Sequence, residues 1–118
     1  MEFVAFVGKD AENWGQITAL MNRLECERVI LVQNKESGDF PVNEKTTVIK
    51  VDSSKPMIEL KEFIMEKIKP LLSGDFEVAV SLASGNGKEH MAFISALINV
   101  PVGIRIVAFT KEGIAYLS

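Results

Sequence analysis

Short apolar runs without polar alternation recur along this chain and constrain its fold more than any other feature. Val29–Val32 and Val78–Val80 are the clearest, each too short for a helix and each close to charged or turn-forming residues. A strand has this pattern when both of its faces are buried, as in a parallel sheet covered by helices on both sides. The sequence therefore predicts an α/β protein.

Segments with helical periodicity lie between these runs. In the first, Ile17, Leu20, Met21 and Leu24 repeat at helical spacing. In the second, an apolar stripe faces away from a charged one, and Ser73-Gly74-Asp75 is predicted to end the helix. The predicted helices are Ala11–Leu24, Pro56–Leu71 and Lys88–Asn99.

The strands and helices alternate in an order that favours crossover connections. The predicted strands are Glu2–Val7, Val29–Gln33, Thr46–Val51, Phe76–Leu82, Ile104–Phe109 and Gly113–Leu117. Turn-forming residues from Lys35 to Lys45 indicate a surface loop, and the last two strands form a hairpin. Strand–helix–strand crossovers are right-handed and build parallel sheets. We predict one Rossmann-like domain spanning residues 1–118, with a mostly parallel sheet, helices on both faces and a C-terminal β-hairpin.

Composition narrows the classes of function. Of the 118 residues 47% are hydrophobic, which is enough for a packed core. The formal net charge of −3 argues against binding of a long nucleic acid. The single cysteine, Cys26, cannot form an internal disulfide or a cysteine metal cluster. No signal-peptide pattern or membrane-length apolar run is present, so we expect a cytoplasmic protein without membrane contact, metal or cofactor.

The segment with the clearest chemical potential runs from Ser81 to Lys88, at a predicted strand end just before a helix. Ligands of open α/β sheets collect at such strand ends, and a helix N-terminus offers unpaired N–H groups to an anion. Gly85 and Gly87 allow positive φ and close backbone approach. Ser84 and Asn86 offer hydrogen bonds, and Lys88 supplies a positive charge. We predict a phosphate site here.

An alternative interpretation of Gly85-Asn86-Gly87 is a plain strand-to-helix turn in which Asn86 caps the helix. The spacing of the glycines matches neither a Walker A loop nor the dinucleotide-binding fingerprint. An ATPase or an NAD-dependent enzyme is therefore disfavoured.

The turn Gly85-Asn86-Gly87-Lys88, followed by Met91, resembles the Gly-Gly-Thr-Lys-like turn of CARF (CRISPR-associated Rossmann fold) domains. The order of strands, the variable loop and the closing hairpin are similar too. The chain departs from the family pattern with Gly87 where threonine is usual and Ser81 where an acidic residue often lies. The resemblance implies a sensor of cyclic oligoadenylates in which Lys88 meets a phosphate and Ser84 replaces a preceding threonine or serine.

The resemblance also implies ligand contacts from the loop after the first strand. Here Gly8, Lys9, Asp10 and Asn13 occupy that loop. Alternatively, Asp10 or Asn13 caps the following helix and Lys9 is solvated. Trp14 would stack on a base, lie in a dimer contact or serve as a half-buried anchor.

Sequence assigns no catalytic residue. His90 is the only histidine and has no defined partner, so we interpret it as an ordinary surface or boundary residue. Asp52, Ser53 and Ser54 precede the second predicted helix and are explained by capping it.

Two functions remain open. In the first, a homodimer binds a cyclic oligoadenylate or a similar nucleotide messenger in a symmetric cleft and, in one variant, cleaves the ring as a ring nuclease. Met91, Ser95, Ile98 and the region of Trp14 are the candidates for the two-fold contact. In the second, an unrelated Rossmann-like protein binds or processes a small phosphorylated metabolite.

Overall fold

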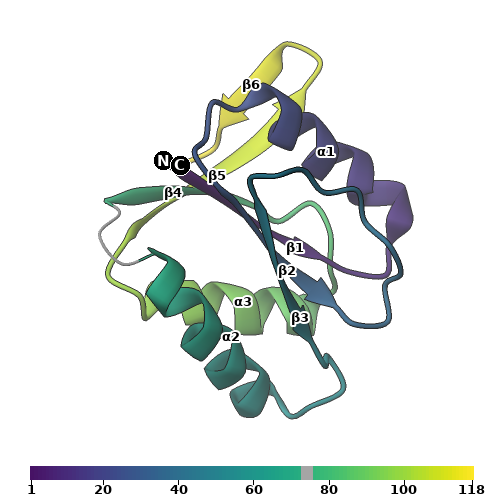
Figure 1. Ribbon diagram of the computed structural model, residues 1–118, viewed down its shortest axis with the longest axis vertical. Helices are drawn as coiled ribbons and strands as arrows, with labels where there is room; N and C mark the ends of the chain where they lie inside the picture. The colour runs from purple at the N-terminus through teal and green to yellow at the C-terminus, as the bar shows by residue number, and fades with distance from the viewer. Residues whose placement is uncertain (73–75) are drawn as a thin grey trace.

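A mixed sheet runs through the part of the chain that the computed structural model describes, residues 1–72 and 76–118. Its strands are β1 (Glu2–Val7), β2 (Val29–Asn34), β3 (Thr46–Val51), β4 (Glu77–Ser81), β5 (Gly103–Thr110) and β6 (Gly113–Tyr116). They lie in the order β3-β2-β1-β4-β5-β6 (Figure 1). All neighbouring pairs are parallel except β5 and β6, which form an antiparallel hairpin. The predicted fold class is confirmed.

The apolar runs of the sequence occupy the middle of this sheet. Every residue of Val29–Val32 has no exposed surface, and Val78 and Val80 in β4 have none either. In β1, Phe3, Ala5 and Val7 pack into one core, whereas Val4 and Phe6 pack into the other. Successive side chains of a strand point to opposite faces, so a sheet that is covered twice needs apolar residues at both.

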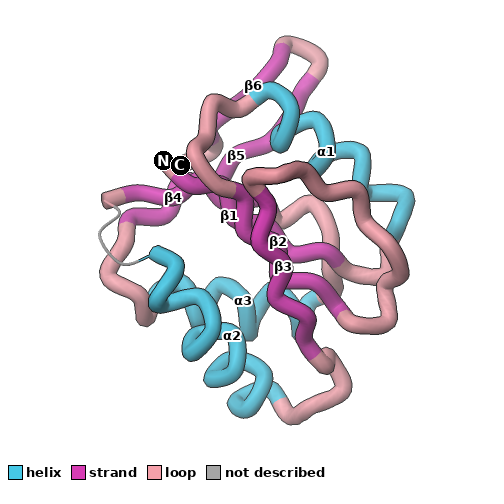
Figure 2. The backbone as a smooth tube through the Cα atoms, in the orientation of Figure 1, coloured by secondary structure: helices cyan, strands magenta, loops and turns pink. Residues whose placement is uncertain are grey.

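Helices cover both faces, as the sequence predicts (Figure 2). One face carries α1 (Trp14–Arg23), and the other carries α2 (Met57–Leu72) and α3 (Gly87–Ile98) side by side. The Phe6 and Phe93 rings meet edge to face at 5.8 Å between the sheet and α3. Burial of each such ring contributes about 1.5–3 kcal/mol. No helix in the described segments is long and apolar enough to cross a lipid bilayer.

The connection between β2 and β3 contains no helix, and the predicted loop over Lys35–Lys45 is confirmed. Phe40 of this loop is 7% exposed and packs into the core under α1. Its ring meets the Trp14 ring edge to face at 5.3 Å. The loop therefore covers sheet surface that a second helix would cover in a fully wound Rossmann fold.

The side-chain caps proposed for the first two helices are wrong. Residues Ala11–Asn13 form a 3₁₀ turn (η1) before α1, and neither Asp10 nor Asn13 makes a side-chain cap bond. The α2 helix begins only at Met57, beyond Ser53 and Ser54. These polar side chains form hydrogen bonds with other segments or within their own loop instead. The predicted helix stop at Ser73-Gly74-Asp75 lies outside the described residues.

Candidate functional site

Four strands end at the same edge of the sheet, and the loops that follow them meet there. From β1 the chain winds outward through β2 to β3, and from β4 it winds the other way to β5. The gap between β1 and β4 is therefore the topological switch point, where open α/β sheets bind their ligands. The site lies at this point.

A serine and an aspartate join the loops after β1 and β4. The Gly8 N–H donates to Ser84 Oγ at 2.9 Å, and Ser84 Oγ donates to Asp10 Oδ1 at 2.7 Å. Asp10 Oδ1 also accepts the Gly85 N–H at 3.0 Å. Ser84 has no exposed surface. Hydrogen bonds between buried polar groups, each with a partner, thus hold the two loops together.

The environment of Asp10 acts on its pKa in two directions. Burial raises the pKa, but hydrogen bonds from Asn13, Ser84 and the Gly85 N–H lower it, and the net result lies below the ordinary value of 3.8. Asp10 therefore stays ionised at neutral pH. Asn13 takes part through its Nδ2, which donates to Asp10 Oδ2 at 2.7 Å.

Two glycines allow the same two loops to approach each other. A Cβ on Gly8 would lie 2.7 Å from the Gly85 Cα, closer than real Cβ atoms approach backbone. Gly85 has a φ of +108°, so the predicted positive φ is confirmed there. For Gly87 that prediction is wrong, because Gly87 is the first residue of α3 and a Cβ there would meet nothing within 4 Å.

The amino end of α3 carries a reciprocal cap. Asn86 Oδ1 accepts the Glu89 N–H at 2.8 Å, and Glu89 Oε1 accepts the Asn86 N–H at 2.9 Å. The capping role proposed for Asn86 is thus confirmed, and this capping box leaves two amides open. Within the described chain, neither the Gly87 nor the Lys88 N–H makes a hydrogen bond. Helix geometry directs both groups out of the N-terminus.

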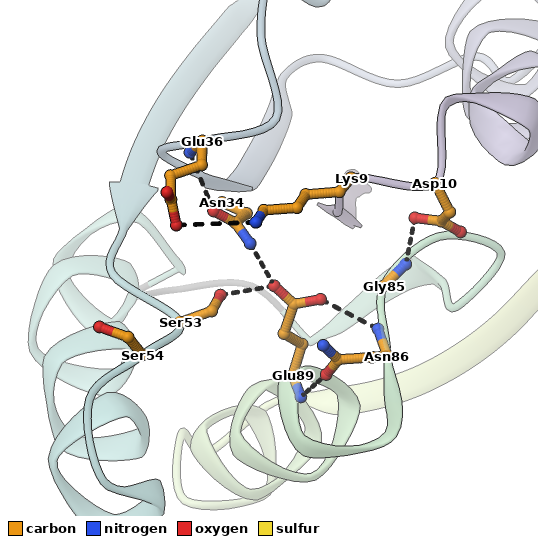
Figure 3. A pocket seen from close by; sticks show the side chains of 9 residues that line it. All are labelled: Lys9, Asp10, Asn34, Glu36, Ser53, Ser54, Gly85, Asn86 and Glu89. Atoms are coloured by element: carbon orange, nitrogen blue, oxygen red, sulfur yellow. Dashed lines mark hydrogen bonds and ion pairs between the residues drawn. The ribbon is translucent and has the colours of Figure 1, made fainter.

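Glu89 also binds the loops after β2 and β3. Its Oε2 accepts Asn34 Nδ2 at 2.9 Å and the Ser53 hydroxyl, as Figure 3 shows. The Glu89 side chain is 2% exposed, and both oxygens have partners. A buried carboxylate needs this full set of donors. Glu89 therefore fixes three strand-end loops relative to α3.

A pocket of about 400 Å³ opens beside this cap. Its lining is polar and comes from all four loops: Lys9, Asp10, Asn34, Glu36, Ser53, Ser54, Gly85, Asn86 and Glu89 (Figure 3). Lys9 Nζ reaches Glu36 Oε1 at 3.8 Å, with each side chain 61% exposed. The open Gly87 and Lys88 N–H groups directly follow Asn86, a lining residue, and the cavity has the size that encloses small ligands.

The structure brings together most of the predicted site residues. Lys9, Asp10, Gly85 and Asn86 line the pocket, and Gly8 and Ser84 hold the wall behind it. Three other predicted residues do not line the pocket: Asn13, Gly87 and Lys88. Asn13 supports Asp10 from an exposed position, and Lys88 Nζ donates to the Ser53 carbonyl at 2.8 Å. The Lys88 ammonium is therefore engaged by the loop after β3, and only its backbone N–H is without a hydrogen bond in the described structure.

Sequence reasoning did not assign five lining residues to the site: Asn34, Glu36, Ser53, Ser54 and Glu89. Their common signal is position, because four of them end β2 or follow β2 and β3 at the edge where ligands bind. Glu89 had a local signal as well. It stands three residues after Asn86, the spacing of a capping box.

Three other residues have structural roles at this edge. His90 Nε2 lies 2.7 Å from the Ser84 carbonyl oxygen and supports the turn. Trp14 Nε1 donates to the Gly8 carbonyl at 3.0 Å, so Trp14 anchors the first loop rather than lining the pocket. Asp52 accepts the Ser54 N–H and hydroxyl and pairs with Lys35, which lowers its pKa to about 2.

Comparison with known protein families finds no family model that matches the chain, and comparison with curated proteins finds no related sequence.

Proposed function

We propose that this protein binds a nucleotide through a phosphate at the amino end of α3. The specific ligand proposed is a cyclic oligoadenylate, because the Gly85–Lys88 turn resembles that of CARF domains. One observation carries the proposal: in the described structure the Gly87 and Lys88 N–H groups make no hydrogen bond, and they directly follow Asn86, which lines the 400 Å³ pocket at the switch point. Backbone N–H groups and the helix dipole favour an anion at that position.

The rest of the pocket suits the uncharged parts of a nucleotide. Asn86 uses its Oδ1 in the cap, so its Nδ2 is left as a donor at the pocket wall. The Lys9 ammonium lies on the opposite side and is more than half exposed (Figure 3). Sugar hydroxyls and base edges are recognised by such hydrogen-bond donors and acceptors when these are placed in a largely pre-formed pocket.

A second copy of the chain is part of this proposal. Met91 and Ile98 on α3 are 62% and 68% exposed, and they lie two turns apart on the helix whose first turn forms the anion site. A two-fold contact through this stripe would place two sites near one axis, which suits a ligand with its own symmetry. Attack of a ribose 2′-hydroxyl on the adjacent phosphate would break the bond from phosphorus to the 5′-oxygen of the next nucleotide. It would leave a 2′,3′-cyclic phosphate and a protonated 5′-hydroxyl, and the protein would then be a ring nuclease.

A matched pair of variants at Gly87 tests the anion site. Proline is tolerated at the first position of a helix but has no N–H, and Asn86 already has the extended conformation that precedes proline (ψ 179°). Gly87→Pro should weaken binding of cyclic tetraadenylate about tenfold to hundredfold, the value of one hydrogen bond to a charged group. Isothermal titration calorimetry measures the change.

Gly87→Ala is the control, because it adds a Cβ and keeps the N–H. It should bind like the parent and fold at least as stably, since no atom crowds the new Cβ. Equal binding by the proline and alanine variants would exclude the Gly87 N–H from the site. Absence of binding to any ring size by the parent would remove the cyclic oligoadenylate.

A small phosphorylated metabolite is the second candidate. The observation that favours it is the volume of the pocket, about 400 Å³, which is the size of pockets that enclose small molecules. The calorimetric stoichiometry separates the two ligands. A ring held on a two-fold axis binds once for every two chains, and a metabolite binds once per chain.

A further inference from the structure

The pocket beside the anion donors is itself acidic. Its lining holds three carboxylates, Asp10, Glu36 and Glu89, and one ammonium, Lys9, which gives a formal charge of −2. A site that takes phosphate in such surroundings pays a growing electrostatic cost with each further negative charge on the ligand. The charge of the lining therefore bears on which phosphates can enter.

Two of the three carboxylates are already stabilised by local hydrogen-bond donors. Asp10 and Glu89 each accept three hydrogen bonds from side chains and backbone amides of the surrounding loops. Hydrogen bonds of this kind stabilise a carboxylate and partly cancel its field toward a ligand. Both groups also hold the loops in place, so neither is free to respond to a ligand.

Glu36 differs from them in both respects. Within the described structure its carboxylate has one partner, Lys9, at the long distance of 3.8 Å, and its side chain is 61% exposed. Its backbone is nevertheless fixed, because the Glu36 N–H donates to Asn34 Oδ1 at 2.9 Å. The carboxylate lines the pocket on the side opposite Asn86, the cap of α3 (Figure 3).

We propose that Glu36 makes the site selective for phosphodiester groups over terminal phosphomonoesters. This inference rests on the proposed nucleotide site. A phosphodiester carries one negative charge, whereas a monoester carries about −1.5 to −2 at neutral pH. The amides of α3 meet the first charge, and the Glu36 carboxylate repels the second and competes with it for Lys9.

Three linear probes of one sequence test this selectivity together with cyclic tetraadenylate. They are linear tetraadenylate with a free 3′-hydroxyl, the same chain with a 3′-phosphate, and the same chain with a 5′-phosphate. The parent should bind the terminal phosphates about two- to fivefold more weakly than the hydroxyl form, the range of one interaction between exposed charges. Glu36→Gln should remove this difference and raise affinity most for the monoesters.

Two variants make the comparison specific. Glu36→Asp keeps the charge and should keep the discrimination. Glu44→Gln removes an exposed charge from the same loop, away from the pocket lining, and should leave the discrimination unchanged.

Each outcome decides one claim. A monoester penalty that Glu36→Gln removes supports the inference. Binding of the cyclic probe with no penalty in the parent, or with a penalty that Glu36→Gln leaves intact, overturns the inference and leaves the nucleotide site standing. Failure of the cyclic probe and of all three linear probes to bind the parent overturns the site and the inference together.

Discussion

At Asp10, one carboxylate joins two loops whose residues lie 74 positions apart in the chain. Its donors come from the turn after β4 and from its own loop, so the group links the two halves of the sheet. Burial raises its pKa, but the hydrogen bonds from Asn13, Ser84 and Gly85 more than offset this and leave it below 3.8. The ionised form is therefore the form that the fold prefers.

This preference predicts a dependence of stability on pH. A carboxylate whose pKa is lower in the folded chain than in the unfolded chain contributes stability above the unfolded pKa and loses it as pH falls through the folded pKa. The free energy of unfolding should thus fall as pH drops from about 5 toward 2. Asp10→Asn keeps an acceptor for the Gly85 N–H and should flatten that fall. Urea denaturation at several pH values measures it.

Asp52 also titrates in this window, with a pKa lowered to about 2, so Asp10→Asn should leave a residual slope. Asp52→Asn is the matched comparison, since Asp52 takes no part in the hydrogen bonds of Asp10 with Ser84 and Gly85 that join the loops after β1 and β4. If Asp10→Asn and the parent lose stability in parallel down to pH 2, the contact between the loops after β1 and β4 does not depend on the ionised carboxylate.

Among the elements, β5 is longer than the strand beside it. Its pairing with β4 extends only to Val80 opposite Ile106, yet β5 continues to Thr110. A side chain of α1 completes the open edge. Gln16 Nε2 donates to the Phe109 carbonyl at 2.9 Å, and the Phe109 N–H donates to Gln16 Oε1 at 3.1 Å. One amide side chain thus imitates a neighbouring strand and fixes α1 to the sheet.

Removing this amide leaves two partly buried backbone groups without a protein partner. Gln16→Ala should lower the free energy of unfolding by about 1–3 kcal/mol. Amide hydrogen exchange at Phe109 should also become faster. Asn22→Ala, at an exposed position of the same helix, is the control and should change stability by less than about 0.5 kcal/mol. A loss in Gln16→Ala no larger than the control's would show that water replaces the amide without cost.

The elements themselves were predictable from local pattern, because burial on two faces or on one stripe leaves a direct periodicity in the sequence. Glu2–Val7 and Thr46–Val51 match their predicted strands, and the α helices differ from prediction by a few residues. The helix caps were less predictable. Asp10 and Ser53 have the composition of caps, but both bond across the sheet edge, and no local pattern encodes such a partner.

In the molecule as a whole, the proposed anion site and two exposed apolar side chains lie on one helix, α3. Met91 and Ile98 lie on the outer side of α3, with Ser95 between them half-buried. Large apolar side chains exposed in a row are a common mark of an interface. We expect a dimer through α3, and the double variant Met91→Lys with Ile98→Lys should be monomeric.

Multi-angle light scattering at micromolar concentration tests this assembly. The parent should have twice the 13.0 kDa mass of the chain, and the double variant should have the mass of one chain. Val42→Lys changes an exposed apolar residue in the loop between β2 and β3 and should remain dimeric. A parent that is itself monomeric at that concentration would count against the dimer and favour the small phosphorylated metabolite, which needs only one chain.

The candidate site was predictable only where a single segment builds it. The turn from Ser84 to Lys88 shows its glycines and its cap in a few consecutive residues. Asn34, Glu36 and Ser53 belong to the site because β2 and β3 end beside β1, which depends on strand order. Local sequence carries no information on that order, so these residues have no distinguishing signal of their own.

The contact between the loops after β1 and β4 also has a consequence for how the chain folds. The Gly8 N–H and the Ser84 hydroxyl are separated by 76 residues, and the strands between them must find their parallel neighbours before the two groups meet. Contacts of such high sequence separation close late and slowly, because the entropy of a long loop is lost first. We therefore expect the pocket to form in the last stage of folding. A ligand that binds there would bind only completely folded chains. It would therefore shift the folding equilibrium toward the complete fold and away from partly folded chains.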